Sequence, residues 1–406
     1  MEFLKNLFVN IGLWFQGLLV GAGLPDIWVR VITLVLGAFV LAFVPLIAMF
    51  FLGWYERKIV ARIADRLGPN NTGAFGGPYG ILQIVADAIK IFTKEDLVPD
   101  GANRGVFNAS PMLMLAVAVA VWAVIPFGEG LIGSDLNIGV IYILALGSGS
   151  MIAVLMAGWG ANNKYAMLAA LRSIATLISY EIPQVLALVA VVMVAGSFST
   201  QDIVKFQDVP LLFTLPLTAL LFFAAALSEL GRRPFDLVEA DSEIVAGYLI
   251  EYSGVKFILY YLAEFMNQFM ISVLFATLFL GGWRGPWVDQ APALGPIWLG
   301  IKAFLVLFVF QLFQYTLPRL RIDQILGFCW KFLTPLALVN VCVMALVGKL
   351  APYDSANPWV WAGIFLLINI LLGALVILVL EVAGRLAQRR KEAELTVSLE
   401  EETAPA

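Results

Sequence analysis

Nine long apolar runs limit the fold of this 406-residue chain more than any other feature of its sequence. Five of them carry no charged residue: 31–52, 111–128, 138–159, 209–228 and 359–380. The other four contain an ionisable residue within the run or at its edge: 174–197, 257–281, 297–317 and 328–348. A helix of ~20 apolar residues is long enough to cross the hydrocarbon core of a bilayer. The sequence therefore predicts an all-α polytopic membrane protein with about nine transmembrane helices.

The composition favours the same fold class. Hydrophobic residues make up 61% of the chain and charged residues only 13%, whereas a soluble domain carries about 25% charged residues. Water-soluble, disordered and fibrous proteins are therefore excluded. Pro45 and Pro216 fall inside two of the runs, and a kink is expected at each of them.

The distribution of basic residues predicts the orientation, because positive charge is retained on the cytoplasmic side. If run 31–52 crosses from outside to inside, 19 of the 25 Lys and Arg residues lie inside and four lie outside. We therefore expect the N-terminus outside and the C-terminus in the cytoplasm. The first 26 residues are a poor match to a signal peptide, and we expect a short interfacial or re-entrant helix there.

The residue types that are missing exclude several kinds of chemistry. The chain has no histidine and only two cysteines, Cys329 and Cys342. It therefore lacks an imidazole ligand for haem or metal, a histidine-dependent nucleophile, and the thiolates that a cubane cluster usually takes. We predict no metal site and no catalytic nucleophile. Any redox centre must belong to a partner, and proton chemistry falls to carboxylates, Lys, Arg, Tyr and water.

Segment 77–96 has the pattern of an amphipathic helix that is too polar to cross a bilayer. Apolar residues up to Phe92 recur every three or four positions, while Asp87 and Lys90 lie on the opposite face. Such a helix lies in the membrane interface. It is either a surface anchor, which composition alone favours, or the lip of an opening through which an amphiphile enters from the bilayer.

Charged residues cluster at the inner ends of two predicted helices. They are Glu56, Arg57, Arg62 and Arg66 after the first span, and Arg319, Arg321 and Asp323 in the last inside loop. Positive-inside anchoring explains the first basic cluster on counts alone, although Glu56 at the end of a span needs a partner such as Arg57. The second cluster fits anchoring and the binding of a polar head group equally well.

The inside loop 229–256, taken with its flanks, is the most unusual segment, because it carries six acids and three bases. The acids are Glu229, Asp236, Glu239, Asp241, Glu243 and Glu251. A helix here would stack Asp236, Glu239 and Glu243 on one face, where like charges repel and favour the uptake of a proton. Such a row suits a proton relay or a charge-sensing switch. The alternative is a set of salt bridges to the basic patch of a partner.

Two further acids, Glu181 and Glu264, lie within predicted spans. An ionised carboxylate in the bilayer is costly, so such residues normally face a protein interior or a hydrated cavity. A functional role is therefore the default interpretation. The alternative is a buried pair, which Glu181 could form with Arg172, Lys164 or Tyr180.

Several of these segments are motifs that follow one another in a fixed order. They are Glu56-Arg57-Lys58, Arg66-Leu67-Gly68-Pro69-Asn70, the helix Asp87-Ala88-Ile89-Lys90-Ile91-Phe92-Thr93-Lys94-Glu95, Ser179-Tyr180-Glu181, Glu229, Arg233-Pro234-Phe235-Asp236-Leu237, Glu239-Ala240-Asp241-Ser242-Glu243, Glu251-Tyr252-Ser253-Gly254 and Arg321-Ile322-Asp323-Gln324. Together they resemble the H subunit of respiratory complex I, the NADH–quinone oxidoreductase. The resemblance runs from about residue 27 to residue 348.

The resemblance implies a multi-pass subunit of the bacterial inner membrane, at the junction of a peripheral arm and a membrane arm. It would form part of the chamber in which a quinone, either ubiquinone or menaquinone, is reduced as substrate, and it would couple that reduction to proton translocation. NAD, flavin and the iron–sulfur clusters would be bound by partners, with no haem on this chain. The implied partners are iron–sulfur and quinone-reducing peripheral subunits, small membrane subunits, antiporter-like subunits and membrane lipid, and no nucleic acid.

The resemblance also implies two groups of site residues. The wall of the quinone chamber and its opening would include Glu56, Arg57, Arg62, Arg66, Asp87, Lys90, Phe92, Arg319, Arg321 and Asp323. The proton relay would include Glu181, Glu229, Asp236, Glu239, Asp241, Glu243, Glu251 and Glu264.

The expected organisation places an interfacial segment at 1–26, an eight-helix core at 27–348 with cytoplasmic loops 53–109 and 231–256, a ninth helix within 349–383, and a cytoplasmic tail at 384–406. The sequence departs from the family pattern at Asp241, where Glu is commoner, and in having the ninth helix. The alternatives are a related subunit of a complex I-like enzyme or membrane-bound hydrogenase, an ion transporter, or a structural anchor. A transporter should show inverted repeats, and none is visible.

Overall fold

A computed structural model of the chain describes residues 7–23, 25–70, 80–236, 246–288, 290–351 and 358–403. Within these residues the regular elements are helices, apart from an isolated β-bridge between Gly128 and Leu131. The all-α fold predicted from the sequence is confirmed.

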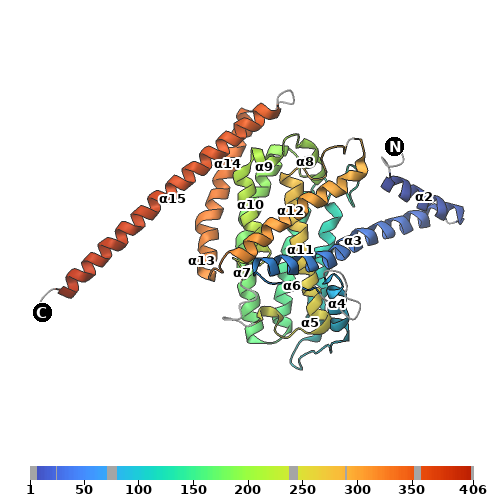
Figure 1. Ribbon diagram of the computed structural model, residues 1–406, viewed down its shortest axis with the longest axis horizontal. Helices are drawn as coiled ribbons and strands as arrows, with labels where there is room; N and C mark the ends of the chain where they lie inside the picture. The colour runs from blue at the N-terminus through green and yellow to red at the C-terminus, as the bar shows by residue number, and fades with distance from the viewer. Residues whose placement is uncertain are drawn as a thin grey trace.

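Eight helical segments among the described residues are long and apolar enough to cross a membrane (Figure 1). They are α3 (Asp26–Ile63), α5 (Arg104–Ala120) with η2 (Val121–Val124), α6 (Gly139–Gly160), α7 (Lys164–Ala195), α11 (Gly254–Phe279), η4 (Pro292–Leu294) with α12 (Gly295–Thr316), α13 (Ile322–Phe328) with η5 (Cys329–Leu333) and α14 (Thr334–Leu350), and α15 (Pro358–Thr403). The shorter helices are α2 (Leu7–Gly21), α4 (Gln83–Thr93), α8 (Thr200–Phe206), α9 (Leu211–Thr214), α10 (Pro216–Glu229) and η3 (Gly247–Leu249).

The predicted run 209–228 forms a broken helix. α9 ends at Thr214, Leu215 adopts φ −126° and ψ 55°, and α10 begins at Pro216. Pro216 has no N–H to donate to a carbonyl four residues back, which explains the break. The sequence predicts a kink at Pro216, and the structure has a complete break there, which divides the fifth predicted span. α3 continues through Pro45 as one helix.

α7 and α11 lie at the centre of the bundle. In the most apolar stretch of each helix, 50% of the α7 residues and 72% of the α11 residues are buried. The fully buried side chains of α11 include small and aromatic ones, among them Tyr260, Ala263, Ala276 and Phe279. Small residues allow neighbouring helices to approach closely in a membrane, and the two central helices therefore hold the other spans together.

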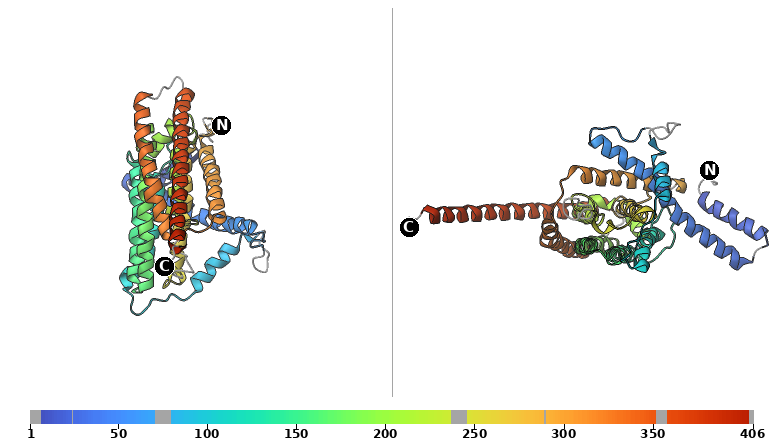
Figure 2. Two further views of the ribbon diagram at one scale, coloured as in Figure 1. Left: turned by 90° about the vertical axis from the view of Figure 1, so that its left-hand side faces the viewer. Right: turned by 90° about the horizontal axis from the view of Figure 1, so that it is seen from below.

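α3 and α15 are the most exposed of the long helices, since only 6% and 11% of the residues in their apolar stretches are buried. They extend from the bundle on opposite sides, α3 together with α2 and α15 towards the C-terminus (Figures 1 and 2). Lipid or other membrane proteins must cover their wide apolar faces, because the exposure of so much apolar surface to water is unfavourable.

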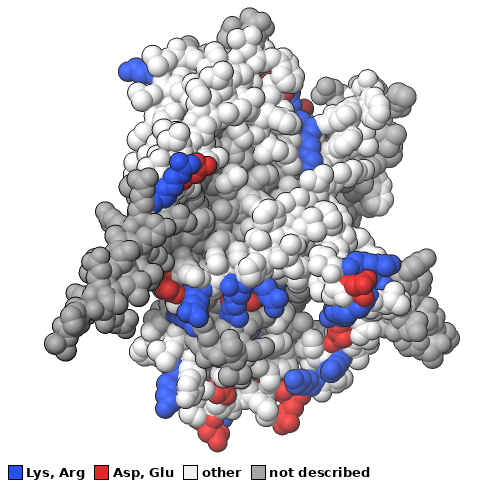
Figure 3. Space-filling view, turned by 60° about the vertical axis from the view of Figure 1, so that its left-hand side comes forward, with Lys and Arg blue, Asp and Glu red and all other residues white. Residues whose placement is uncertain are grey.

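α4 confirms that the segment after residue 77 is partly helical, although the helix is shorter than predicted. It spans Gln83–Thr93, none of its residues is buried, and it lies beside α3 at the lower end of the bundle (Figure 2). On the face shown in Figure 3, charged side chains gather mainly at this lower end, and the middle of the molecule is mostly uncharged. That division is the one expected for a bundle that crosses a bilayer.

Candidate functional site

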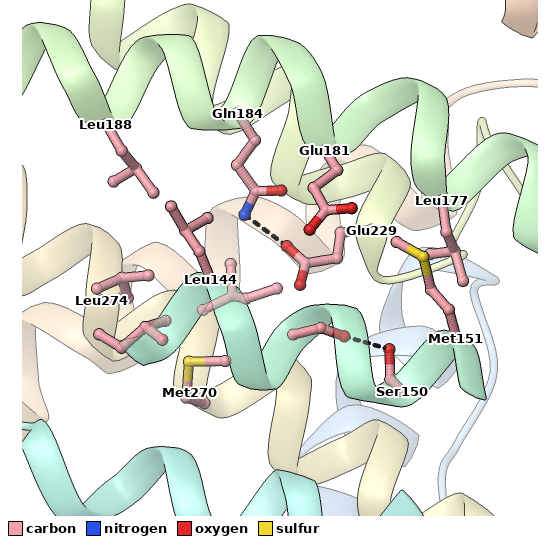
Figure 4. Close-up of a pocket in the computed structure, with 13 residues that line it drawn as sticks. Leu144, Ser150, Met151, Leu177, Glu181, Gln184, Leu188, Glu229, Met270 and Leu274 are labelled. Carbon is pink, nitrogen blue, oxygen red and sulfur yellow. Dashed lines mark hydrogen bonds between the residues drawn. The ribbon is translucent and has the colours of Figure 1, made fainter. Parts of the chain in front are cut away.

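A cavity between α6, α7, α10 and α11 holds two glutamates, Glu181 and Glu229 (Figure 4). The other residues that line it are Ile143, Leu144, Gly147, Ser150, Met151, Leu177, Gln184, Leu188, Met270, Ile271 and Leu274. Its volume of ≈ 30 Å³ has room for about two water molecules, since one water needs about 10–15 Å³ on this measure. The cavity is therefore a small polar site inside an apolar bundle.

The helical repeat of α7 brings its four lining residues to one face. Leu177, Glu181, Gln184 and Leu188 are separated by four, three and four residues, which is the spacing of side chains that lie above one another on a helix. Glu229 is the last residue of α10. α6 approaches it at a glycine, and a Cβ added to Gly147 would lie 3.5 Å from Glu229 Oε1.

Neutral polar side chains bind both carboxylates. Gln184 Nε2 donates a hydrogen bond to Glu229 Oε2 at 2.6 Å, and Ser148 Oγ donates to Glu181 Oε1. In Figure 4 the carboxyl group of Glu181 points towards that of Glu229, and one Glu229 oxygen faces the Gln184 amide. Two carboxylates, a hydroxyl group and space for water are the components that a proton needs to move between residues in a membrane.

A second polar group surrounds Glu56, which is only 8% exposed although it lies near the C-terminal end of α3. The Tyr315 hydroxyl donates to Glu56 Oε1, and Gln314 Nε2 donates to the Tyr315 hydroxyl at 3.2 Å. Gln268 Nε2 lies 3.4 Å from Gln314 Oε1. These contacts connect α3 through α12 to α11.

A third group lies around Glu264, on α11 four residues before Gln268. Arg232 Nη2 is 3.8 Å from Glu264 Oε2, and the Tyr248 hydroxyl donates to Glu264 Oε1 at 3.4 Å. The Arg232 guanidinium also lies over the Phe265 ring at 5.6 Å. Glu264 is therefore in contact with both Arg232 and Tyr248 in this structure.

Charged side chains connect α3 to α4 at the lower end of the bundle. Arg57 Nη1 is 2.5 Å from Asp87 Oδ2 of α4. Lys58 Nζ donates at 2.5 Å to Asn70 Oδ1, in the segment that follows α3. Gln83 Nε2 supports the same aspartate, 3.2 Å from Asp87 Oδ1. Asp87 of α4 is thus turned to α3, while Phe92 is 71% exposed.

The described ends of the acidic loop pack against neighbouring helices. Asn163 Nδ2 donates to Glu251 Oε1 at 2.7 Å, and Asp236 is 8% exposed. The Tyr252 hydroxyl donates to the Phe107 carbonyl at 3.1 Å, and burial raises the pKa of this hydroxyl. Lys256 Nζ is 3.0 Å from Asp96 Oδ2. These contacts fix the loop at both of its ends.

The remaining candidates are scattered or lie outside the described residues. Lys90, Arg62, Arg66, Arg321 and Asp323 are exposed. Arg319 is partly buried, and its Nη2 has no hydrogen-bond partner among the described residues. Glu239, Asp241 and Glu243, with the helix predicted to stack them, lie outside the described residues. In the described part of the chain, no group of three or more Asp, Glu or Cys side chains could hold a metal ion.

The neutral members of these groups are not predicted from the sequence, namely Ser148, Gln184, Gln268, Gln314 and Tyr315. A usable signal exists for two of them: Gln184 lies three residues after Glu181, and Gln268 lies four residues after Glu264. Polar residues at helical spacing from an acid within an apolar run share its face. The contact between Glu56 and Tyr315 joins residues 259 positions apart, and no local pattern reveals it.

The chain matches the family model described as NADH dehydrogenase over residues 36–345. It is similar to proteins that are named as the H subunit of NADH-quinone oxidoreductase. The protein of Dehalococcoides mccartyi strain CBDB1 is 44% identical over 330 residues, which cover 81% of this chain and 90% of that protein. The protein of Thermomicrobium roseum is 44% identical over 340 residues, which cover 79% and 97%. The protein of Rhodospirillum centenum is 44% identical over 314 residues, which cover 76% and 91%.

Proposed function

Because the chain belongs to the family formed by the H subunits of NADH-quinone oxidoreductase, we propose that it borders the quinone chamber of a proton-translocating complex and couples quinone reduction to proton movement. Membership of the family makes it a subunit of an oxidoreductase complex and a multi-pass membrane protein. The proposal adds its role within the complex. We further propose a bacterial inner membrane as its location, with the N-terminus outside and the C-terminus in the cytoplasm.

The observation that carries the proposal is the pair of glutamates in the cavity between four helices (Figure 4). The cavity walls are mostly Leu, Ile and Met side chains, so a charge there is costly and proton exchange between the two acids and water is favoured. Such a pair has no evident value as a membrane anchor. It is suited to carry a charge change laterally in the plane of the membrane.

The polar contacts between α3 and α4 support the proposed opening for quinone. In this proposal an amphiphile leaves the bilayer past the exposed apolar face of α4, which includes Phe92, and the charged pair Arg57–Asp87 holds that helix beside α3. The buried Glu56 with Tyr315 forms part of the wall farther in. Quinone is the substrate, and a partner protein of the complex reduces its head group.

Quinone reduction consumes protons and produces a more basic head group, so nearby carboxylates change their charge state. We assign this response to the loop acids Asp236, Glu239, Asp241, Glu243 and Glu251, and the lateral transfer to Glu264, Glu229 and Glu181. Arg232 beside Glu264 supports a switch, because a change in the charge of that carboxylate alters an ion pair at the start of the loop.

The function requires partners that supply the electron path. We propose that peripheral subunits bind NAD, flavin and the iron–sulfur clusters, and that small and antiporter-like membrane subunits cover the exposed faces of α3 and α15. Gentle solubilisation tests this part directly. The chain should purify together with flavin and iron–sulfur proteins, and a monodisperse colourless particle would contradict the proposal.

Single substitutions in the intact complex test the carboxylate role. Glu181→Gln and Glu229→Gln should each slow NADH-dependent quinone reduction while the complex assembles normally. Glu129→Gln is the matched control, because Glu129 is an exposed acid outside the cavity. Wild-type turnover in both cavity variants would leave a structural anchor as the better interpretation of this protein.

A photoreactive quinone tests the chamber. Irradiation of the intact complex should label peptides of this chain from the inner part of α3 and from α4, and excess unmodified quinone should suppress the labelling. Labelling that is confined to other subunits would contradict a chamber wall here.

A further inference from the structure

Glu181 lies two residues before a proline inside its own helix. Pro183 is inside α7 and has no N–H, so the carbonyl of Ser179, four residues earlier, lacks its helical partner. A carbonyl without a partner is costly in a membrane, where water does not replace the lost hydrogen bond. A group outside α7 must therefore satisfy Ser179.

That group is the thiol of Cys329. Its Sγ lies 2.8 Å from the Ser179 carbonyl oxygen, and Cys329 is fully buried. The thiol is a weak donor, yet it is the side chain that takes the place of the missing N–H of Pro183. Cys329 and Pro183 thus act on the same carbonyl from two helices.

Cys329 is the first residue of η5, a π-helical turn between α13 and α14. Pro335 at the start of α14 explains this turn, because its ring excludes the ordinary helical hydrogen bond to the carbonyl four residues earlier. A π-turn inserts one extra residue and rotates the side chains that follow, and such turns are frequent at functional sites. Here the turn lies beside the interrupted segment of α7.

Two further hydrogen bonds connect the same segments. Trp330 Nε1 donates to Ser179 Oγ at 3.1 Å, and the Tyr180 hydroxyl donates to the Ile325 carbonyl at 3.1 Å. Both residues that precede Glu181 are therefore held by the region around η5. The direction of the Glu181 side chain follows from theirs, because a helix fixes the angle between successive residues.

We propose that Cys329 and Trp330 are positioning residues that hold the proline-interrupted turn of α7, so that Glu181 faces Glu229 in the cavity. The proposal rests on the proposed function of the glutamate pair and extends it to residues outside the cavity. Neither residue exchanges a proton with Glu181. They determine where its carboxylate lies relative to Ser148 and Glu229.

The test compares Cys329→Val, which removes the donor at similar size, with Cys329→Ser, which keeps a donor. Cys329→Val in the intact complex should slow quinone reduction about fivefold, as expected for one lost hydrogen bond, and should shift the pH profile of turnover. Cys329→Ser should retain the wild-type pH profile, and Cys342→Val at an exposed position is the control. If Cys329→Val only lowers the yield of assembled complex, and the assembled fraction turns over at the wild-type rate with the wild-type pH profile, the positioning role is overturned.

A double-mutant cycle tests the shared carbonyl. Pro183→Ala restores the helical N–H. Cys329→Val should therefore lower the rate of quinone reduction much less in a Pro183→Ala background than in the wild type. Equal costs in the two backgrounds would contradict the proposal.

Infrared spectroscopy separates this inference from the proposed function. The S–H stretching band of Cys329, obtained as the difference between the spectra of the wild-type and Cys329→Val complexes, should lie at the frequency of a hydrogen-bonded thiol, whereas the frequency of a free thiol would overturn the inference. If Glu181→Gln leaves turnover unchanged, the proposed function fails while the thiol band still tests the contact. If Glu181→Gln slows turnover and Cys329→Val does not, the positioning role alone fails.

Discussion

Glu229 accepts a hydrogen bond at 2.6 Å from the amide of Gln184, which lies three residues after Glu181. Gln184→Leu keeps much of the volume but removes the donor to a carboxylate. Because hydrogen bonds to charged groups contribute more than neutral ones, we expect quinone reduction to slow about tenfold. The measurement is NADH-dependent quinone reduction by the purified complex.

The control is Gln290→Leu, the same chemical change at an exposed loop position. Equal rates for Gln184→Leu and the control would show that the amide does not support Glu229.

At Glu56, a buried carboxylate depends on the Tyr315 hydroxyl, and its second oxygen, Oε2, has no hydrogen-bond partner among the described residues. Tyr315→Phe removes the donor and should destabilise the protein by about 1–3 kcal/mol, the cost of leaving a buried acceptor unsatisfied. Thermal unfolding is measured by maleimide labelling of the buried Cys329, with Cys342 replaced by Ser.

Tyr165→Phe is the matched control, because Tyr165 is 56% exposed. The stability lost on Tyr315→Phe should also be smaller when Glu56 is first replaced by Gln. An undiminished loss in the Glu56→Gln background would exclude the carboxylate as the cause.

The sequence predicts the charged members of the site but not their neutral hydrogen-bond partners. Acids within apolar runs are conspicuous, because their burial costs energy, and Glu181 and Glu264 are found in that way. Gln184, Ser148 and Tyr315 are neutral and therefore inconspicuous. The pairing of Glu264 with Arg232 also depends on how the loop returns to α11, which no local spacing determines.

At the scale of elements, the ion pair between Arg57 and Asp87 joins α4 to the first span. Because both side chains are partly exposed, at 49% and 32%, a contribution of only about 0.5 kcal/mol to stability is expected. Its proposed importance is the placement of α4. Arg57→Asp or Asp87→Arg should raise the KM for quinone, and the double variant should recover part of the loss.

The measurement is quinone reduction as a function of quinone concentration at low and high salt. The effect should weaken at high ionic strength, because salt screens exposed charges. A KM that is unchanged in both single variants would contradict a role of this pair in the quinone opening.

α15 lies entirely after the part of the chain that matches the family model. Its first turns nevertheless pack against the bundle through Trp361, Phe365 and Asn369. Asn369 Nδ2 donates to the Thr214 carbonyl at 3.2 Å, at the break between α9 and α10. Asn369→Leu should lower stability by about 1–2 kcal/mol, because that carbonyl loses its partner in an apolar environment.

The same maleimide labelling of Cys329 measures this loss, and Ile370→Ala at a 57% exposed position of α15 is the control. A melting temperature that matches the control would show that α15 does not stabilise the break.

Element boundaries show which local signals are reliable. The apolar runs predict the long spans because length and hydropathy are local properties, and Pro216 predicts the break for the same reason. The helix after residue 77 is shorter than predicted, since its periodic pattern continues beyond the residues that α4 includes. The π-turn at Cys329 has no signal of its own in the apolar pattern.

At the scale of the whole molecule, three polar groups lie within an otherwise apolar bundle. They surround Glu56, Glu264, and the pair Glu181 and Glu229. α11 carries Glu264 and Gln268 and also lines the glutamate cavity, so one central helix is part of all three groups. In our account, charge changes that begin at the quinone reach the cavity through this helix and the acidic loop.

The most direct test of this account records proton translocation and quinone reduction together in vesicles that contain the intact complex with Glu181→Gln and Glu229→Gln combined. Electron transfer from NADH to a soluble acceptor and the assembled subunits serve as controls, with Glu129→Gln as the matched variant. The account predicts that proton translocation falls at least about tenfold, since both carboxylates of the cavity lose their exchangeable proton. Proton translocation and quinone reduction at wild-type rates would contradict it.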